Sequence, residues 1–198
     1  QGRNGKLCVP QGEFCGAGRP VYSAGVFSQM SHRQIVPILL AAGGSKRLGF
    51  PRPLALFGRR TALSIAVENC KGLARPIIVL GCDAGKIRPT IPPGARVVLN
   101  RNWRKGQLSS LLSALRLVPR KSAFMIYPVD QPLLQWRTIQ LLVRAFRDRP
   151  VGKEIAMPVY RGKDGHPVLI AGGLQEEFAK AKTPRDVIYR DPERIQRV

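Results

Sequence analysis

One segment, residues 39–53, constrains this chain most, because it runs an apolar strand into a loop of small residues and then into cations. Residues 40–45 read Leu-Ala-Ala-Gly-Gly-Ser, and Lys46, Arg47 and Arg52 follow. Paired glycines let the backbone turn sharply and approach a ligand without interference from Cβ, which leaves N–H groups free to face an anion. The segment therefore predicts a loop that binds phosphate.

Two common phosphate loops do not fit these residues. A P-loop needs Lys and Ser or Thr directly after its last glycine, whereas Phe50 and Pro51 follow Gly49. The dinucleotide-binding fingerprint needs glycines at its first, third and sixth positions, and Ser45 and Leu48 break it. Both readings fail.

Strand-like and helix-like patterns alternate along the chain from residue 35 onward. The apolar run 35–40 predicts a buried strand, with Pro37 tolerated near its start. Further strands are predicted at 76–80, 96–99 and 123–127, and helices at 61–70, 108–115, 139–146, 174–181 and 185–189. Two apolar runs, 155–160 and 167–170, are expected to form a hairpin or a closely paired excursion. This alternation predicts a three-layer α/β/α sandwich with a mostly parallel sheet, whose ligands bind beyond the carboxyl ends of the strands.

A carboxylate, Asp130, follows the predicted strand 123–127 and precedes Gln131 and Pro132. Mg²⁺ takes oxygen ligands, often one or two carboxylates together with substrate phosphates, so Asp130 is the candidate metal ligand. The alternative is that Asp130 caps the helix that follows, since Asp is a favoured N-cap residue.

A polar segment, residues 100–110, leads into the leucine-faced helix. A loop that enters a helix offers N–H groups to an anion, and Ser109 and Ser110 add hydroxyl donors. Asn100 is a candidate for contact with a nucleotide or metal. Alternatively, Ser109 or Gln107 caps the helix while Trp103 packs.

Together these segments resemble the signature of the MobA-like nucleotidyltransferases, and 100–110 is similar to the molybdenum cofactor cytidylyltransferase branch. Residues 40–49 match the family loop, but Arg52 stands where the family has lysine. Arg keeps the charge as a planar fork rather than a point charge. The resemblance implies a nucleotide-diphospho-sugar transferase-like fold, with Asp130 holding Mg²⁺. It also implies substrate contacts at Gln131 and at His166, for which a structural role in a turn is the alternative.

The activity implied is transfer of a nucleoside monophosphate from an NTP, with CTP favoured, to a phosphorylated small-molecule acceptor such as molybdopterin cofactor. Pyrophosphate would leave, and no protein nucleophile is needed. Arg47, Arg52 and Asp130 are the expected catalytic residues. The expected nucleotide-binding residues are Leu40, Ala41, Ala42, Gly43, Gly44, Ser45, Asn100, Ser109 and Ser110. The alternatives are a sugar-phosphate nucleotidyltransferase and a catalytically silent basic binding module of the same fold.

The net charge of +21 points to anionic partners. The cations are scattered, which fits an arginine-rich solvated surface or an anionic substrate funnel better than nucleic acid, whose single-stranded forms also require interleaved exposed aromatics. No C-x-x-C pair or zinc-site spacing accompanies the four cysteines and two histidines. Reduced thiols and the absence of an 18-residue apolar window favour a cytoplasmic protein without a membrane span.

The chain is expected to hold one domain. Residues 1–29 contain many glycines and no helical periodicity, so we expect a non-native or disordered extension ahead of Met30. Residues 30–198 are expected to form the MobA-like domain in a C-terminally truncated form. Family members continue into a segment containing Asp, Thr and Pro that supplies a second magnesium ligand, so we expect weakened Mg²⁺ binding.

Overall fold

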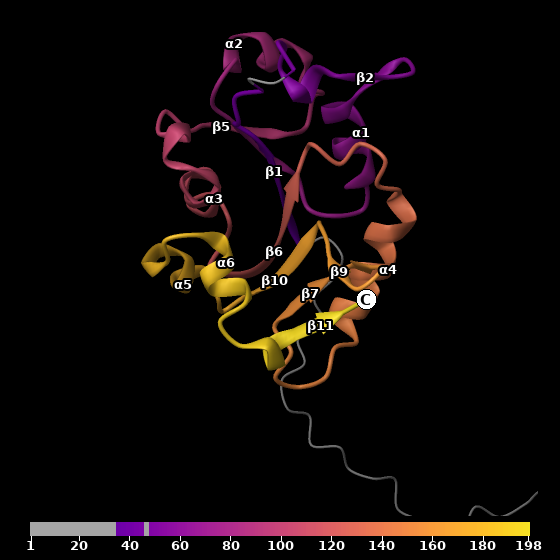
Figure 1. The fold of residues 1–198 in the computed structure, drawn as a ribbon, viewed down its shortest axis with the longest axis vertical. Coiled ribbons are helices and arrows are strands. Elements are labelled where there is room, and N and C mark those ends of the chain that lie inside the picture. Colours follow the sequence, from indigo (N-terminus) through magenta and orange to yellow (C-terminus); the bar gives the residue numbers. More distant parts are fainter. Residues whose placement is uncertain (1–34, 46–47) are drawn as a thin grey trace, which may run out of the picture.

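The structure is a computed structural model that describes residues 35–45 and 48–198 (Figure 1). The expected extension 1–29 and the expected start at Met30 lie outside the described residues. The strands are β1 (Val36–Ala41), β2 (Leu56–Phe57), β3 (Arg60–Thr61), β4 (Ile77–Leu80), β5 (Arg96–Leu99), β6 (Lys121–Pro128), β7 (Ile155–Met157), β8 (Val159–Tyr160), β9 (Lys163–Asp164), β10 (Val168–Gly172) and β11 (Ile195–Arg197). The α-helices are α1 (Ala62–Asn69), α2 (Ala84–Ile87), α3 (Gln107–Leu115), α4 (Trp136–Arg147), α5 (Gln175–Lys180) and α6 (Pro184–Ile188).

A seven-stranded sheet runs through the molecule in the order β11-β7-β10-β6-β1-β4-β5. β1 pairs in parallel with β4 and β6, β4 pairs in parallel with β5, and β11 pairs in parallel with β7. Within the described part of the chain, β10 alone runs against its neighbours in this sheet. The predicted mostly parallel sheet is confirmed.

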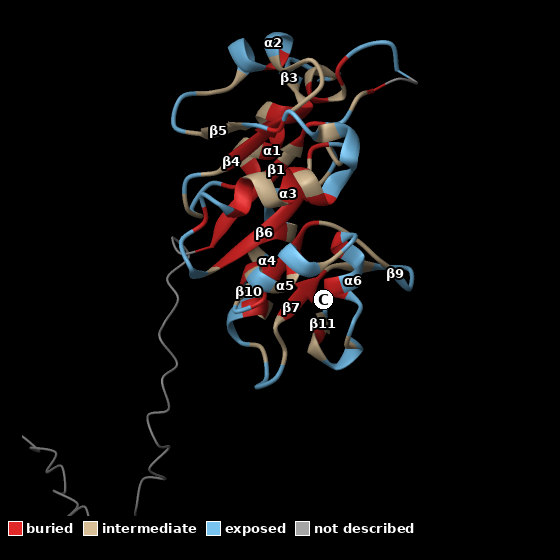
Figure 2. Cartoon of the chain, turned by 90° about the vertical axis from the view of Figure 1, so that its left-hand side faces the viewer, coloured by how far each residue is buried: buried red, intermediate tan, exposed pale blue. Residues whose placement is uncertain are grey.

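Helices cover both faces of the sheet because side chains alternate along each buried strand. In β1, Val36 and Ile38 join the core beneath α3, α5 and α6, whereas Leu39 and Ala41 join the core beneath α1 and α4. Figure 1 shows these two groups of helices on opposite sides of the sheet, and Figure 2 shows that the central strands of the sheet are buried. The predicted three-layer α/β/α sandwich is confirmed.

Part of the predicted pairing of 155–160 with 167–170 is also present. Leu169 pairs with Ala156, and Ile170 pairs with Ile155, in antiparallel register. A smaller hairpin, β8 and β9, lies between them, and its turn residues Arg161 and Gly162 both have positive φ. Two positive φ values in succession give the local twist that suits a two-residue hairpin turn.

The edge strand β11 was not expected. It lies beside β7, and ion pairs hold it and the turn before it: Arg197 contacts Asp164 at 2.9 Å, and Arg194 contacts Glu154 and Glu177 at 2.5 and 2.8 Å. No helix among the described residues is long and apolar enough to cross a membrane.

Candidate nucleotide site

The loops that follow β1, β4, β5 and β6 meet at one edge of the sheet. Gly81, directly after β4, lies so close to its neighbours that a Cβ there would be 2.6 Å from the carbonyl oxygen of Ala42 and 2.7 Å from Cβ of Trp103. The N–H of Cys82 donates to that same carbonyl of Ala42 at 3.0 Å. The missing side chain at position 81 therefore lets three loops touch, which fixes the start of the small-residue loop.

The far end of this loop is fixed by Ser45 and a short 3-10 helix, Arg52–Leu54. The backbone N–H of Arg52 donates to the Ser45 hydroxyl at 2.8 Å, and the carbonyl of Ser45 accepts from the N–H of Leu48 at 2.9 Å. Ser45 is 8% exposed. These bonds close the loop on itself and set where the Arg52 side chain begins. Arg47 lies outside the described residues.

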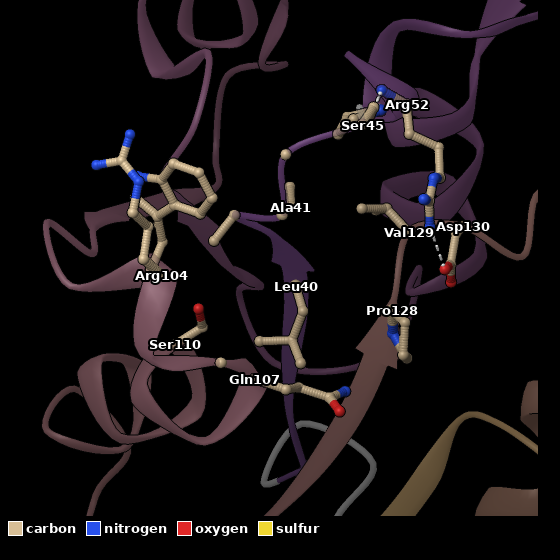
Figure 3. A pocket seen from close by; sticks show the side chains of 16 residues that line it. Leu40, Ala41, Ser45, Arg52, Arg104, Gln107, Ser110, Pro128, Val129 and Asp130 are labelled. Atoms are coloured by element: carbon tan, nitrogen blue, oxygen red, sulfur yellow. Dashed lines mark hydrogen bonds and ion pairs between the residues drawn. The ribbon is translucent and has the colours of Figure 1, made fainter. Parts of the chain in front are cut away.

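The side chain of Arg52 reaches the carboxylate of Asp130. Nη1 of Arg52 and Oδ2 of Asp130 are 2.7 Å apart, and both side chains are about two-fifths exposed. Asp130 follows β6, and the N–H of Val129 donates to the carbonyl of Leu40 at 3.3 Å, which ties this loop to the end of β1. Two residues that are 78 positions apart in sequence thus form an ion pair at the cleft, drawn as the dashed line in Figure 3.

The cleft between these loops has a volume of about 340 Å³. This lies within the range of small-molecule pockets, roughly 300–1,000 Å³. Three segments line it: the residues from the end of β1 to the 3-10 helix, those from the loop before α3, and those after β6. They are Leu40, Ala41, Ala42, Gly43, Gly44, Ser45, Arg52, Pro53, Trp103, Arg104, Gly106, Gln107, Ser110, Pro128, Val129 and Asp130.

The wall opposite Arg52 consists of Trp103 and Arg104. The guanidinium carbon of Arg104 lies 4.7 Å from the centre of the Trp103 ring, a cation–π contact. Gln107 lies beneath Leu40 in Figure 3, with its amide directed toward Pro128. The cleft therefore has a cation on each side and a neutral amide that can both donate and accept hydrogen bonds.

Asn100 is a buried residue that holds the loop between β5 and α3 in place through its side-chain hydrogen bonds. It is 3% exposed, its Nδ2 donates to the hydroxyls of Ser109 and Ser110 at 2.9 and 3.0 Å, and its Oδ1 accepts from the N–H of Asn102 at 2.9 Å. Ser110 lines the cleft, whereas Asn100 and Ser109 are not among its lining residues. Nucleotide contact by Asn100 and Ser109 stays a prediction, and the structure adds a positioning role.

The two predicted substrate residues, Gln131 and His166, are half-buried and are not part of the cleft lining. Nδ1 of His166 is buried without a hydrogen-bond partner among the described residues. Burial lowers the pKa of His166, and the negative charge of Asp130 opposes this effect. The imidazole is therefore favoured in its neutral form, and the contacts proposed for both residues remain predictions.

The donor set for a metal ion is sparse. Among the described residues no group of three or more His, Cys, Asp or Glu side chains could hold one, and Asp130 is the carboxylate in the cleft lining. One carboxylate still fits Mg²⁺ or Mn²⁺, provided that substrate phosphates and water supply the other oxygens. The ion pair with Arg52 competes for the same carboxylate.

The described cysteines, Cys70 and Cys82, are free thiols, as predicted. Burial raises the pKa of Cys70 to about 12, so this group stays protonated and unreactive near neutral pH.

Sequence reasoning placed most of the cleft but missed several lining side chains. Trp103, Arg104 and Gln107 lay within the segment that was singled out, yet were not assigned contact with a ligand. The signal was available, because they occupy the loop between a strand end and a helix start. Which of those residues face the cleft depends on loop conformation, which the residue pattern does not encode.

Comparison with known proteins decides the family. The MobA-like NTP transferase domain matches residues 37–194. This chain belongs to that family. The resemblance drawn from the small-residue loop and Asp130 is confirmed, and so is the nucleotide-diphospho-sugar transferase-like fold.

Among relatives of this MobA-like protein, nicotine blue oxidoreductase of Paenarthrobacter nicotinovorans is 32% identical over 157 residues, covering 73% of this chain and 74% of that protein. Rv0371c of Mycobacterium tuberculosis H37Rv has a TM-score of 0.74 at 24% identity over 85% of this chain and 89% of its own. Its complex with manganese gives a TM-score of 0.68 at 23% identity, with 83% and 88% covered. Molybdopterin-guanine dinucleotide biosynthesis protein A of Archaeoglobus fulgidus gives 0.63 at 12% identity, with 83% of both chains covered. These structural likenesses show the fold.

Proposed function

We propose that this protein is a divalent-metal-dependent nucleotidyltransferase that transfers a nucleoside monophosphate from an NTP, with CTP favoured, to a phosphorylated acceptor such as molybdopterin cofactor. The observation that carries the proposal is the convergence of the small-residue loop, Arg52 and Asp130 on one cleft. Membership of the MobA-like NTP transferase family supports the same reaction class.

The reaction needs positioning and charge neutralisation rather than a protein nucleophile. A phosphate oxygen of the acceptor attacks the α-phosphorus of the NTP, forming one P–O bond as the bond to the β-phosphate breaks. Pyrophosphate leaves with the electron pair of that bond. Because both reacting groups carry negative charge, the surrounding protein must supply positive charge and oriented N–H groups.

The cleft residues suit these tasks. The backbone of Gly43 and Gly44 can approach the nucleotide closely, since no Cβ intervenes. Arg52 can meet the β- and γ-phosphates as a two-pronged donor, and Arg47 is proposed to do the same. Asp130 would hold Mg²⁺ or Mn²⁺, which when bound neutralises phosphate charge and stabilises the departing pyrophosphate.

The test is pyrophosphate release from CTP, GTP, ATP and UTP, each with Mg²⁺ and with either molybdopterin cofactor or a sugar 1-phosphate. We expect release with CTP and molybdopterin cofactor. The variant Asp130→Asn should lose about 10²–10³-fold in kcat, the scale of removing one charge-stabilising group. The control Asp148→Asn, which alters an exposed carboxylate at the end of α4, should keep the wild-type rate.

Two outcomes would redirect the assignment. Turnover with a sugar 1-phosphate alone would favour the sugar-phosphate nucleotidyltransferase. Folded protein that releases no pyrophosphate from any combination would refute the transferase and leave the silent basic module or the redox candidate described next.

A second candidate is a redox function on the same cleft. The relative at 32% identity is named an oxidoreductase, and the carboxylate proposed for the metal is engaged by Arg52. A small-residue loop that cradles phosphates also suits the pyrophosphate of a dinucleotide electron carrier. Tight binding of NADH or NADPH in EDTA, without pyrophosphate release from any NTP, would favour this candidate.

A further inference from the structure

The contact between Arg52 and Asp130 joins the two groups that the proposed reaction needs for different ligands. Arg52 is the cation expected to meet phosphate, and Asp130 is the carboxylate expected to meet a metal ion. In the structure they neutralise each other at 2.7 Å. A divalent cation approaching Asp130 therefore meets a guanidinium on the same carboxylate.

The backbone of Arg52 is fixed while its side chain keeps freedom to turn. Its N–H is bonded to the Ser45 hydroxyl, and Pro51 and Pro53 on either side restrict the main chain. The side chain itself is 41% exposed and forms a single-point contact through Nη1. The guanidinium can thus exchange the carboxylate for a phosphate in the adjoining cleft without any movement of the loop.

We propose that Arg52 makes metal binding at Asp130 conditional on a bound triphosphate. The triphosphate withdraws the guanidinium from Asp130, because a phosphate accepts two parallel hydrogen bonds from the planar fork and carries more charge than one carboxylate. It also brings the oxygen atoms that complete a Mg²⁺ or Mn²⁺ site with one protein carboxylate. The metal alone finds Asp130 occupied, and the nucleotide alone finds Arg52 occupied.

This inference rests on the proposed function for the identity of the triphosphate, but the competition at Asp130 can be measured without any nucleotide. Coupling between two ligands of one protein is commonly about 5–150-fold and acts equally in both directions. We therefore expect removal of either partner to improve binding of the other partner's ligand.

The first experiment measures Mn²⁺ alone by the electron paramagnetic resonance signal of the free ion. Arg52→Met should bind Mn²⁺ about tenfold or more tightly than the wild type, a gain within that coupling range. The matched control is Arg104→Met, which removes the same charge from the opposite wall, where the guanidinium rests on Trp103 rather than on a carboxylate. The control should change Mn²⁺ affinity far less. Arg52→Gln serves as a second variant of similar length.

The second experiment measures CTP binding in EDTA by calorimetry. Asp130→Asn should bind metal-free CTP more tightly than the wild type, because Arg52 is released to the phosphates. That gain should vanish in the double variant with Arg52→Met, since the released guanidinium is then missing. An equal gain with and without Arg52 would instead reflect only the loss of a negative charge.

The proposal is overturned if Arg52→Met and Arg104→Met change Mn²⁺ affinity equally, or if the gain from Asp130→Asn does not depend on Arg52. The proposed function fails separately. Normal coupling of Mn²⁺ and CTP in a folded protein that releases no pyrophosphate would refute the transferase while the coupling stands.

Discussion

Gly81→Ala tests the packing that fixes the cleft. The new Cβ would lie 2.6 Å from the carbonyl oxygen of Ala42, 2.7 Å from Cβ of Trp103 and 2.9 Å from Cβ of Ala42. All three atoms are at or beside the backbone, so no flexible side chain can swing away to make room. Either the small-residue loop or the loop before α3 must shift.

The expected cost is about 2–3 kcal/mol, the upper part of the range measured for added methyl or methylene groups in well-packed sites. In a domain of this size that corresponds to a fall in melting temperature of roughly 4–12 °C. Urea unfolding followed by circular dichroism measures the free energy of unfolding directly. Because the displaced loops line the cleft, the affinity for CTP should fall as well.

Gly85→Ala is the matched control, since the same methyl group is added four residues later, in α2, where the new Cβ would have no packing neighbour within 4 Å. This variant should be unchanged or more stable by up to about 1 kcal/mol, because alanine is favoured over glycine in a helix. Surface substitutions usually change the free energy of unfolding by no more than about 0.5 kcal/mol. If Gly81→Ala changed it by no more than that, the claim that these loops leave no room for a methyl group would be refuted.

Three further perturbations test the interior. Asn100→Ala removes the partner of the Asn102 N–H and of the Ser110 hydroxyl, whereas the Ser109 hydroxyl keeps its bonds to two carbonyls, and should cost about 1–3 kcal/mol in urea unfolding; an unchanged midpoint would contradict the buried network. Phe178→Ala removes a fully buried ring that packs edge to face on Phe124 at 5.8 Å between centres, and should cost about 3–5 kcal/mol; a loss below about 1 kcal/mol would contradict this packing. For His166, burial lowers the folded pKa below 6.5, so the unfolded chain binds more protons beneath that pH. The stability gained from neutral His166 is complete above pH 6.5 and is lost as pH falls through the folded pKa. The wild type should therefore lose more melting temperature between about pH 7.5 and about pH 5.5 than His166→Gln does. An identical loss in both proteins would count against the lowered pKa of His166.

Much of the sandwich could be predicted because its main strands are buried on both faces. Ile77, Ile78, Val79 and Leu80 are each at most 1% exposed, and they alternate between the two cores. Such a strand must be apolar at every position, whereas a helix such as α4 buries apolar residues at helical spacing on the side that meets the sheet, as at Ile139 and Phe146. These two patterns are readable in the sequence without knowledge of any distant contact.

The short elements could not be predicted in the same way. β11 has three residues, too few for a period, and it is held by pairing with β7 and by Arg197 on Asp164. β2 and β3 have two residues each, and they form a separate two-stranded sheet by pairing with one another. β11 depends on a partner far along the chain, and β2 and β3 are too short to show a period, so sequence reasoning placed no strand at these positions.

In the cleft, too, features that depend on neighbouring residues could be predicted from the sequence, whereas a contact between distant residues could not. The small-residue loop was recognisable because a phosphate-binding loop requires residues with little or no side chain, and alanine and glycine can be identified directly in the sequence. Arg52 and Asp130 were each recognisable as residues suited to phosphate and metal. Their mutual contact depends on the ends of β1 and β6 lying side by side. Because of this contact, each residue is already engaged by the other before any ligand binds. A carboxylate free in the cleft would be open to a metal ion, whereas one paired with Arg52 is proposed to require a ligand that draws the arginine away. The proposed coupling of metal and triphosphate therefore depends on a contact that exists only once the sheet has formed.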